Sequence, residues 1–177
     1  NGDLLVGNMT NVTRINCLNG ARIYQVPRGG GISGGREPVV VGDKYYLWGG
    51  AVGERVAAYD LATGQYLYWS DAIGGSQSSL FAAPDGTVYA PGGSLFALTD
   101  TGSGFTLKWA SAPLAYSPFS TFAVGPDGSV YVTDTGGGRV LQLTGGSVVE
   151  IAGASSLSYP GGVACDGIAA WDGQHWS

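Results

Sequence analysis

Two Asp-Thr-Gly triplets, at 100–102 and 134–136, are the residues of this sequence that most directly suggest chemistry. Two aspartates that share one proton can act as general acid and general base in hydrolysis. Such a pair requires two loops that meet across an approximate twofold axis, each built by its own lobe or subunit. The two triplets lie close together in the chain, inside a repeating pattern of short apolar runs. We therefore predict that both are turns, in which the Asp carboxylate accepts hydrogen bonds from backbone N–H groups.

Groups that could hold a metal ion or a phosphate are sparse. His175 is the only histidine, and Cys17 and Cys165 lie at opposite ends of the chain without a CxxC pair, so no zinc set can be assembled. The Asp-Gly pairs are isolated rather than part of a calcium-binding run. The glycine-rich stretch at 27–36 lacks the Gly-Lys-Ser/Thr ending of a phosphate loop. We predict no catalytic residue, no metal site and no bound cofactor.

Tryptophans are the best remaining candidates for ligand contacts. Trp48, Trp171 and Trp176 lie beside glycine-rich or Asp-Gly turns, where a ring can stack on a sugar or anchor a protein partner. Trp69 and Trp109 instead occupy corresponding positions at the ends of two apolar runs. We expect the first three to be candidate ligand contacts and the other two to pack between neighbouring sheets.

The elements that must position these side chains are short strands in a repeat of roughly 42 residues, which is close to the period of a four-stranded propeller blade. Four apolar runs form each unit, although the first unit shows three. Asp-Gly pairs at 85–86 and 127–128 fit tight hairpin turns, where glycine supplies positive φ. The predicted fold class is all-β: a β-propeller, or a segment of one, with about four blades of four antiparallel strands. The expected blades are 2–30, 37–72, 78–112 and 119–153.

Two kinds of known repeat resemble these units. The stretch "FAVGPDGSVYVTDTGGGRVLQL", within 120–151, resembles an NHL-type propeller repeat. Within 38–110, "RVAAYDLATGQYLYW" and "GSLFALTDTGSGFTLKW" resemble quinoprotein-type repeats. The resemblance implies the propeller architecture. It implies enzyme activity only if the metal-binding histidines or the cofactor pocket and calcium carboxylates of those families are present, and we find no such set.

The tail at 160–177 has two interpretations, which the sequence leaves open. The segment "GGVACDG" is similar to the first strand of a blade and could complete the first blade, which would bring Cys165 into the same blade as Cys17 as a candidate disulfide. Alternatively, "IAAWDGQHWS" starts a fifth blade, and the chain is part of a larger propeller or is completed by another chain.

Composition limits the classes of partner. The net charge is −5, and the 8 basic residues are scattered, so no basic stripe for nucleic acid is present. No apolar run is long enough for a membrane span. Asn8 and Asn11 each begin an N-glycosylation sequon, which in an acidic, glycine-rich chain favours a secreted, extracellular protein.

These observations predict a non-catalytic, secreted recognition or structural module that is part of an extracellular assembly and binds a protein partner or itself. The alternative is a carbohydrate-binding propeller that holds a glycan with its turn aromatics. A third interpretation is a fragment of an NHL- or quinoprotein-like enzyme. Fold alone does not decide among them.

Overall fold

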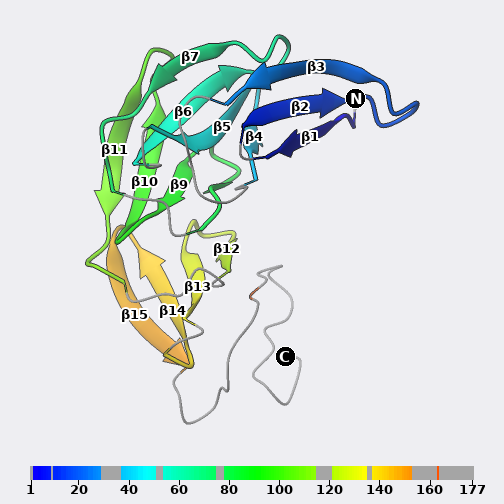
Figure 1. Cartoon of the computed structure of the whole chain (residues 1–177). Coiled ribbons are helices and arrows are strands. Elements are labelled where there is room, and N and C mark those ends of the chain that lie inside the picture. Colours follow the sequence, from blue (N-terminus) through cyan, green and yellow to red (C-terminus); the bar gives the residue numbers. More distant parts are fainter. Residues whose placement is uncertain are drawn as a thin grey trace.

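The computed structural model is an all-β arrangement in which successive sheets follow one another along an arc (Figure 1). It describes residues 2–8, 10–28, 37–50, 54–74, 78–114, 121–134, 137–152 and 163. The strands in these ranges are β1 (Leu4–Gly7), β2 (Asn11–Ile15), β3 (Arg22–Pro27), β4 (Val39–Val41), β5 (Lys44–Gly49), β6 (Arg55–Asp60), β7 (Tyr66–Trp69), β8 (Phe81–Ala82), β9 (Val88–Pro91), β10 (Leu95–Asp100), β11 (Phe105–Ala110), β12 (Phe122–Val124), β13 (Val130–Asp134), β14 (Arg139–Thr144) and β15 (Ser147–Ala152). The predicted all-β propeller fold is confirmed.

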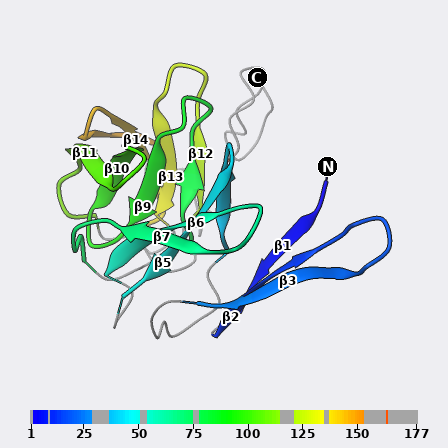
Figure 2. The same ribbon diagram turned by 90° about the horizontal axis from the view of Figure 1, so that it is seen from above.

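The strands form four antiparallel sheets, each from one continuous stretch of chain. Blade 1 has the order β1-β2-β3, blade 2 β4-β5-β6-β7, blade 3 β8-β9-β10-β11 and blade 4 β12-β13-β14-β15. The short strands β4 and β8 contact each other, whereas the last strands β3, β7, β11 and β15 lie on the outer side of the arc (Figure 1). Seen from above, blade 1 lies at one end of the arrangement (Figure 2).

The core lies between blades because side chains alternate between the two faces of each strand. On β5, Tyr45 and Leu47 belong to the cluster shared with blade 1, whereas Tyr46 and Trp48 belong to the cluster shared with blade 3. A third cluster joins blades 3 and 4. Each of the two middle blades therefore buries both of its faces.

The Asp-Gly hairpins have the predicted turn chemistry. Gly86 and Gly128 adopt φ values of 86° and 79°, which L side chains rarely adopt. The Asp85 carboxylate accepts a hydrogen bond from the Thr87 N–H at 2.9 Å, and Asp127 accepts the corresponding bond from Ser129 at 3.0 Å.

Both Asp-Thr-Gly triplets begin at turns, as predicted. Asp134 ends β13, the second strand of blade 4, and accepts a hydrogen bond from the Gly137 N–H at 2.9 Å. Asp100 ends β10, the third strand of blade 3, and accepts one from the Gly102 N–H at 2.6 Å. The two aspartates belong to different blades and each is held by its own turn. Residues 135 and 136 lie outside the described residues.

The two repeat tryptophans pack between blades as predicted, but they are not equivalent. Trp69 pairs with Ala57 and packs toward blade 1, whereas Trp109 pairs with Ala97 and packs toward blade 4. The difference arises because the β10–β11 hairpin of blade 3 is longer than the β6–β7 hairpin of blade 2. In blade 3 the strand pairing continues to Asp100 and Phe105, whereas in blade 2 it ends at Tyr59 and Tyr66. One extra residue reverses the face on which each following side chain lies.

Two further findings concern the described residues alone. They contain no helix that is long and apolar enough to cross a membrane. They also contain no group of three or more His, Cys, Asp or Glu side chains that could hold a metal ion.

Candidate functional site

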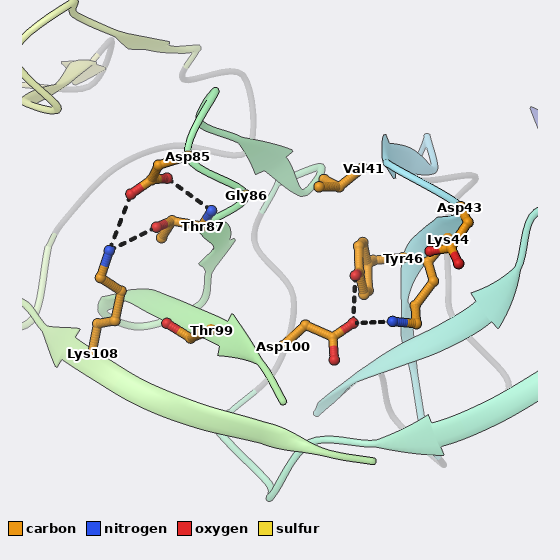
Figure 3. A pocket seen from close by; sticks show the side chains of 10 residues that line it. All are labelled: Val41, Asp43, Lys44, Tyr46, Asp85, Gly86, Thr87, Thr99, Asp100 and Lys108. Carbon is orange, nitrogen blue, oxygen red and sulfur yellow. Dashed lines mark hydrogen bonds and ion pairs between the residues drawn. The ribbon is translucent and has the colours of Figure 1, made fainter. Parts of the chain in front are cut away.

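The candidate site is a cavity of about 320 Å³ at the boundary between blades 2 and 3, called here the blade 2–3 pocket (Figure 3). The first and third turns of an antiparallel four-stranded sheet lie at the same end of the sheet. The β4–β5, β8–β9 and β10–β11 turns therefore meet on one face of the propeller and build the pocket. Its lining residues are Val41, Asp43, Lys44, Tyr46, Asp85, Gly86, Thr87, Thr99, Asp100 and Lys108.

Asp100 forms the floor of the pocket and joins the two blades. Its Oδ2 atom accepts a hydrogen bond from the Tyr46 hydroxyl at 2.6 Å and lies 3.2 Å from the Lys44 ammonium. Its Oδ1 atom accepts bonds from the Tyr68 hydroxyl and the Gly102 N–H, both at 2.6 Å. Three of these four donors come from blade 2, so the carboxylate bridges the interface between the blades.

This network keeps the Asp100 carboxyl ionised at neutral pH. Burial alone would raise the pKa of the Asp100 carboxyl, but the hydrogen bonds from Tyr46, Tyr68, Gly102 and Lys44 outweigh it and lower that pKa. Burial alone would lower the pKa of Lys44, but its bonds to Asp100 and Tyr68 raise it. Burial, and then the bond to Asp100, raises the pKa of Tyr46.

A second ion pair forms one side of the pocket rim. The Lys108 ammonium lies 3.2 Å from Asp85 Oδ2 and donates a hydrogen bond to the Thr87 hydroxyl at 2.9 Å. Side-chain exposures of 43% for Lys108 and 60% for Asp85 leave both groups open to a ligand. The pKa of Asp85 is lowered, chiefly by the Thr87 backbone N–H and hydroxyl, with a smaller contribution from Lys108.

The rest of the rim carries two polar side chains without a hydrogen bond to other described residues. Asp43 and Thr99 are exposed, and their side chains make no hydrogen bond with any described residue. Val41 and Gly86 lie close together: a Cβ atom added at Gly86 would lie 3.8 Å from the nearer Val41 methyl group. The Val41 side chain forms a small apolar part of the pocket wall.

Both lysines of the sequence, Lys44 and Lys108, line this single pocket. The sequence alone does not predict this site, because its residues come from three separate hairpins, β4–β5, β8–β9 and β10–β11. One signal was available: Lys44 and Tyr46 lie two residues apart and so share a face of a buried strand, where a tyrosine hydroxyl needs a hydrogen-bond partner.

The tryptophan candidates are not brought together in this pocket. Trp48 is fully buried, and its indole N–H donates to the Ser78 carbonyl at 2.9 Å. The expectation of an exposed stacking ring at Trp48 was therefore wrong, because the ring faces the core between blades 2 and 3 rather than the adjacent turn. Trp171 and Trp176 lie outside the described residues.

The candidate modification sites lie on blade 1. Asn8 is exposed in the β1–β2 turn, where its Oδ1 atom accepts hydrogen bonds from the backbone N–H groups of Thr10 and Asn11. Asn11 begins β2 and is half-buried. Cys17 is exposed in the β2–β3 turn, and Cys165 lies outside the described residues, so a disulfide between them stays a prediction.

In the tail at 160–177, Val163 is the one described residue. Its backbone N–H donates to the Thr121 hydroxyl at 3.1 Å, beside blade 4. His175 also lies outside the described residues, and neither interpretation of the tail is tested.

Comparisons with known proteins support the fold without giving a family. No protein-family model matches the chain, and no curated relative matches it. Among solved structures, BamB from Moraxella catarrhalis is 17% identical with a TM-score of 0.63, over 85% of this chain and 47% of that one. A catalytically inactive variant of virginiamycin B lyase from Staphylococcus aureus, with quinupristin, is 14% identical with a TM-score of 0.67, over 95% and 58%. A chain of the mitotic checkpoint complex is 17% identical with a TM-score of 0.60, over 75% and 44%.

The chain thus spans about half the length of the propeller chains that it matches. At these identities the likeness shows the β-propeller architecture alone. The resemblance to NHL-type and quinoprotein-type repeats is not tested by it.

Proposed function

We propose that this chain is a non-catalytic recognition module that acts outside the cell and presents the blade 2–3 pocket to a partner. The module belongs to an extracellular assembly in this proposal, and the pocket lies on the face that the partner contacts. The likeness to propeller structures supports the scaffold, and the pocket supports the binding role.

The observation that carries the proposal is the way the charged groups of the pocket are held: Asp100 and Asp85 each lie 3.2 Å from a lysine ammonium and accept a backbone N–H bond from their own turn. The directions of the pKa shifts agree with it. A carboxyl group that acts as a general acid near neutral pH needs a raised pKa, and a lysine nucleophile needs a lowered one. Asp85 and Asp100 have lowered pKa values, whereas Lys44 has a raised one. All three groups therefore stay charged at neutral pH, which suits fixed hydrogen-bonding partners.

The extracellular location is supported by the place of the sequons. Asn8 lies in an exposed turn at the end of the arc, where a glycan can be attached without displacing a packed side chain. The proposal of a carbohydrate-binding role through turn aromatics is weakened at Trp48, which is buried.

Amine-specific acetylation tests the binding role directly, because both lysines line the pocket. The intact protein is treated with an acetylating reagent in the presence and absence of the extracellular fraction of its source, and peptides carrying Lys44 and Lys108 are quantified by mass spectrometry. We expect protection of Lys108, the more exposed lysine.

Substrate panels of esters, peptides and glycosides test the absence of catalysis. We expect no turnover by the wild-type protein. Turnover that disappears in a folded Asp100→Asn variant would overturn the proposal, as would Lys108 acetylation that no extracellular component changes.

A further inference from the structure

The unused hydrogen-bonding capacity of the blade 2–3 pocket indicates what kind of ligand it can hold. The Lys108 ammonium has three N–H donors, of which Asp85 and Thr87 use two. Asp85 accepts bonds from the Thr87 backbone N–H and from Lys108 and interacts with the Thr87 hydroxyl, and its exposed oxygens retain free lone pairs. The Asp43 carboxylate and Thr99 hydroxyl make no bond with any described residue. The rim therefore offers both donors and acceptors, with those of Lys108 and Asp85 on one side of the pocket and Asp43 on the other (Figure 3).

The charges of the pocket disfavour ligands with a large net charge. Lys44 is paired with Asp100, and Lys108 is paired with Asp85, which leaves Asp43 as the carboxylate without a counter-ion among the described residues. An anionic group would meet three carboxylates, and a cationic group could pair with Asp43 only while lying near the ammonium ions of Lys44 and Lys108. A neutral ligand meets neither cost.

The size and the wall of the pocket add two further constraints. The volume of about 320 Å³ lies at the lower end of the ~300–1,000 Å³ that is usual for small-molecule sites. The Val41 side chain, close to the Cα of Gly86, provides one apolar patch among polar groups. The ligand is therefore small, polar on most sides and able to place C–H groups on one side.

We propose that the blade 2–3 pocket binds a neutral, polyhydroxylated ligand, namely one or two saccharide units without acidic groups. Each sugar hydroxyl both donates and accepts, so it can donate to Asp43 or Asp85 and accept from Lys108 or Lys44. The C–H face of the sugar ring packs on Val41. This inference rests on the proposed function and names the ligand class of the same site.

A glycan array that carries neutral, sialylated and sulfated glycans, probed with the full chain, tests the ligand class. The strongest neutral glycan is then titrated into the protein by isothermal calorimetry, and the acetylation of Lys108 is measured at saturation. We expect binding of neutral glycans in preference to acidic ones, together with protection of Lys108 by the titrated glycan.

Two pocket variants and one matched control locate the site. Asp43→Asn and Asp85→Asn each remove one charged acceptor from the rim, and we expect roughly tenfold weaker binding of the neutral glycan in each case. Asp127→Asn makes the same change in the equivalent turn of blade 4, where Asp127 accepts the same bond from Ser129 as Asp85 does from Thr87. We expect Asp127→Asn to bind as the wild type does.

The ligand class is overturned by preference for sialylated or sulfated glycans, or by failure of every glycan to bind folded protein. Equal binding in all three variants overturns the pocket assignment. Failure of the proposed function looks different: the glycan recovered after incubation would be cleaved or otherwise changed by turnover. An unchanged glycan that binds elsewhere overturns the pocket assignment while leaving a non-catalytic module intact.

Discussion

Replacing Asp100 by Asn tests whether the floor of the blade 2–3 pocket holds two blades together. The substitution keeps the shape of the side chain and removes its charge. The carboxylate accepts from two tyrosine hydroxyls and one backbone N–H at 2.6 Å, and Lys44 lies 3.2 Å away. The Asn side chain has one oxygen acceptor in place of two, and Lys44 loses its counter-ion.

The expected loss of stability follows from the exposure of the two partners. A hydrogen bond to a charged group contributes about 1.5–3 kcal/mol, and these four bonds are not additive. The Asp100 side chain is 12% exposed, so little water can replace the lost bonds. Lys44 is 23% exposed and recovers part of its hydration. We therefore expect Asp100→Asn to lower the free energy of unfolding by about 2–3 kcal/mol at pH 7.

Urea denaturation followed by tryptophan fluorescence measures this difference as a function of pH. The native pKa of Asp100 lies below its unfolded value of about 3.9. The stabilisation is therefore complete above about pH 5 and is lost as the pH falls through the lowered native pKa. The gap between wild type and Asp100→Asn should narrow over that acid range.

Asp60→Asn is the matched control, because Asp60 ends the corresponding strand of blade 2 but accepts hydrogen bonds from Thr63 within its own turn. We expect a clearly smaller loss for this variant. A double-mutant cycle of Asp100→Asn with Tyr46→Phe should give a coupling energy well above about 0.5 kcal/mol. Additive effects, or a gap between wild type and Asp100→Asn that is unchanged at pH 2, would refute the bridging role.

Three further outcomes follow from local structure. Gly86→Ala should cost about 1–2 kcal/mol because Gly86 has φ of 86°, whereas Gly93→Ala, with open space around it and no positive φ, should change unfolding by less than about 0.5 kcal/mol; equal effects in urea denaturation would contradict this. Trp48→Phe should cost about 2–4 kcal/mol, since the ring is fully buried and its N–H bond is lost, and wild-type stability would contradict the buried placement. In a secretory host, glycopeptide mass spectrometry should find the glycan at Asn8, in an exposed turn, rather than at half-buried Asn11; the reverse order would count against the β1–β2 turn.

The architecture could be predicted because it depends on local patterns. Asp-Gly pairs fix the hairpins at Gly86 and Gly128, and alternation of apolar residues fixes which side chains leave each strand on the same face. The same local logic identified Asp100 and Asp134 as turn residues rather than as a catalytic pair.

Two expectations were wrong, the equivalence of Trp69 and Trp109 and the exposure of Trp48, because both relied on the distance of a residue from a glycine. Trp69 and Trp109 both follow a glycine at the same spacing, yet they face opposite neighbours because the β10–β11 hairpin extends one residue further. Trp48 precedes a glycine pair, but it lies inside a strand whose alternation directs the ring to the core. Closeness to a turn in the sequence does not make a side chain exposed. Inside a strand, its position in the alternation of faces determines whether it points into the core.

The same extra residue explains why the pocket lies at this boundary. In blade 2, the strand equivalent to β10 ends at Asp60, which is held by its own turn, whereas Asp100 lies one residue further and turns toward blade 2. At the boundary of blades 3 and 4, the corresponding strand β14 ends at Thr144. Its hydroxyl forms a hydrogen bond of 2.9 Å with the Ser129 hydroxyl inside blade 4 and does not reach blade 3.

The charged network is therefore not a general requirement for packing blades together. Blades 3 and 4 bury an apolar cluster at their boundary. Among the described residues there, no carboxylate joins the two blades as Asp100 joins blades 2 and 3. A buried ion pair is weak evidence for stability, because apolar residues of similar volume often serve as well. The presence of both lysines and three aspartates at this single boundary is consistent with the proposed binding role of the rim, in addition to the stabilisation expected from Asp100.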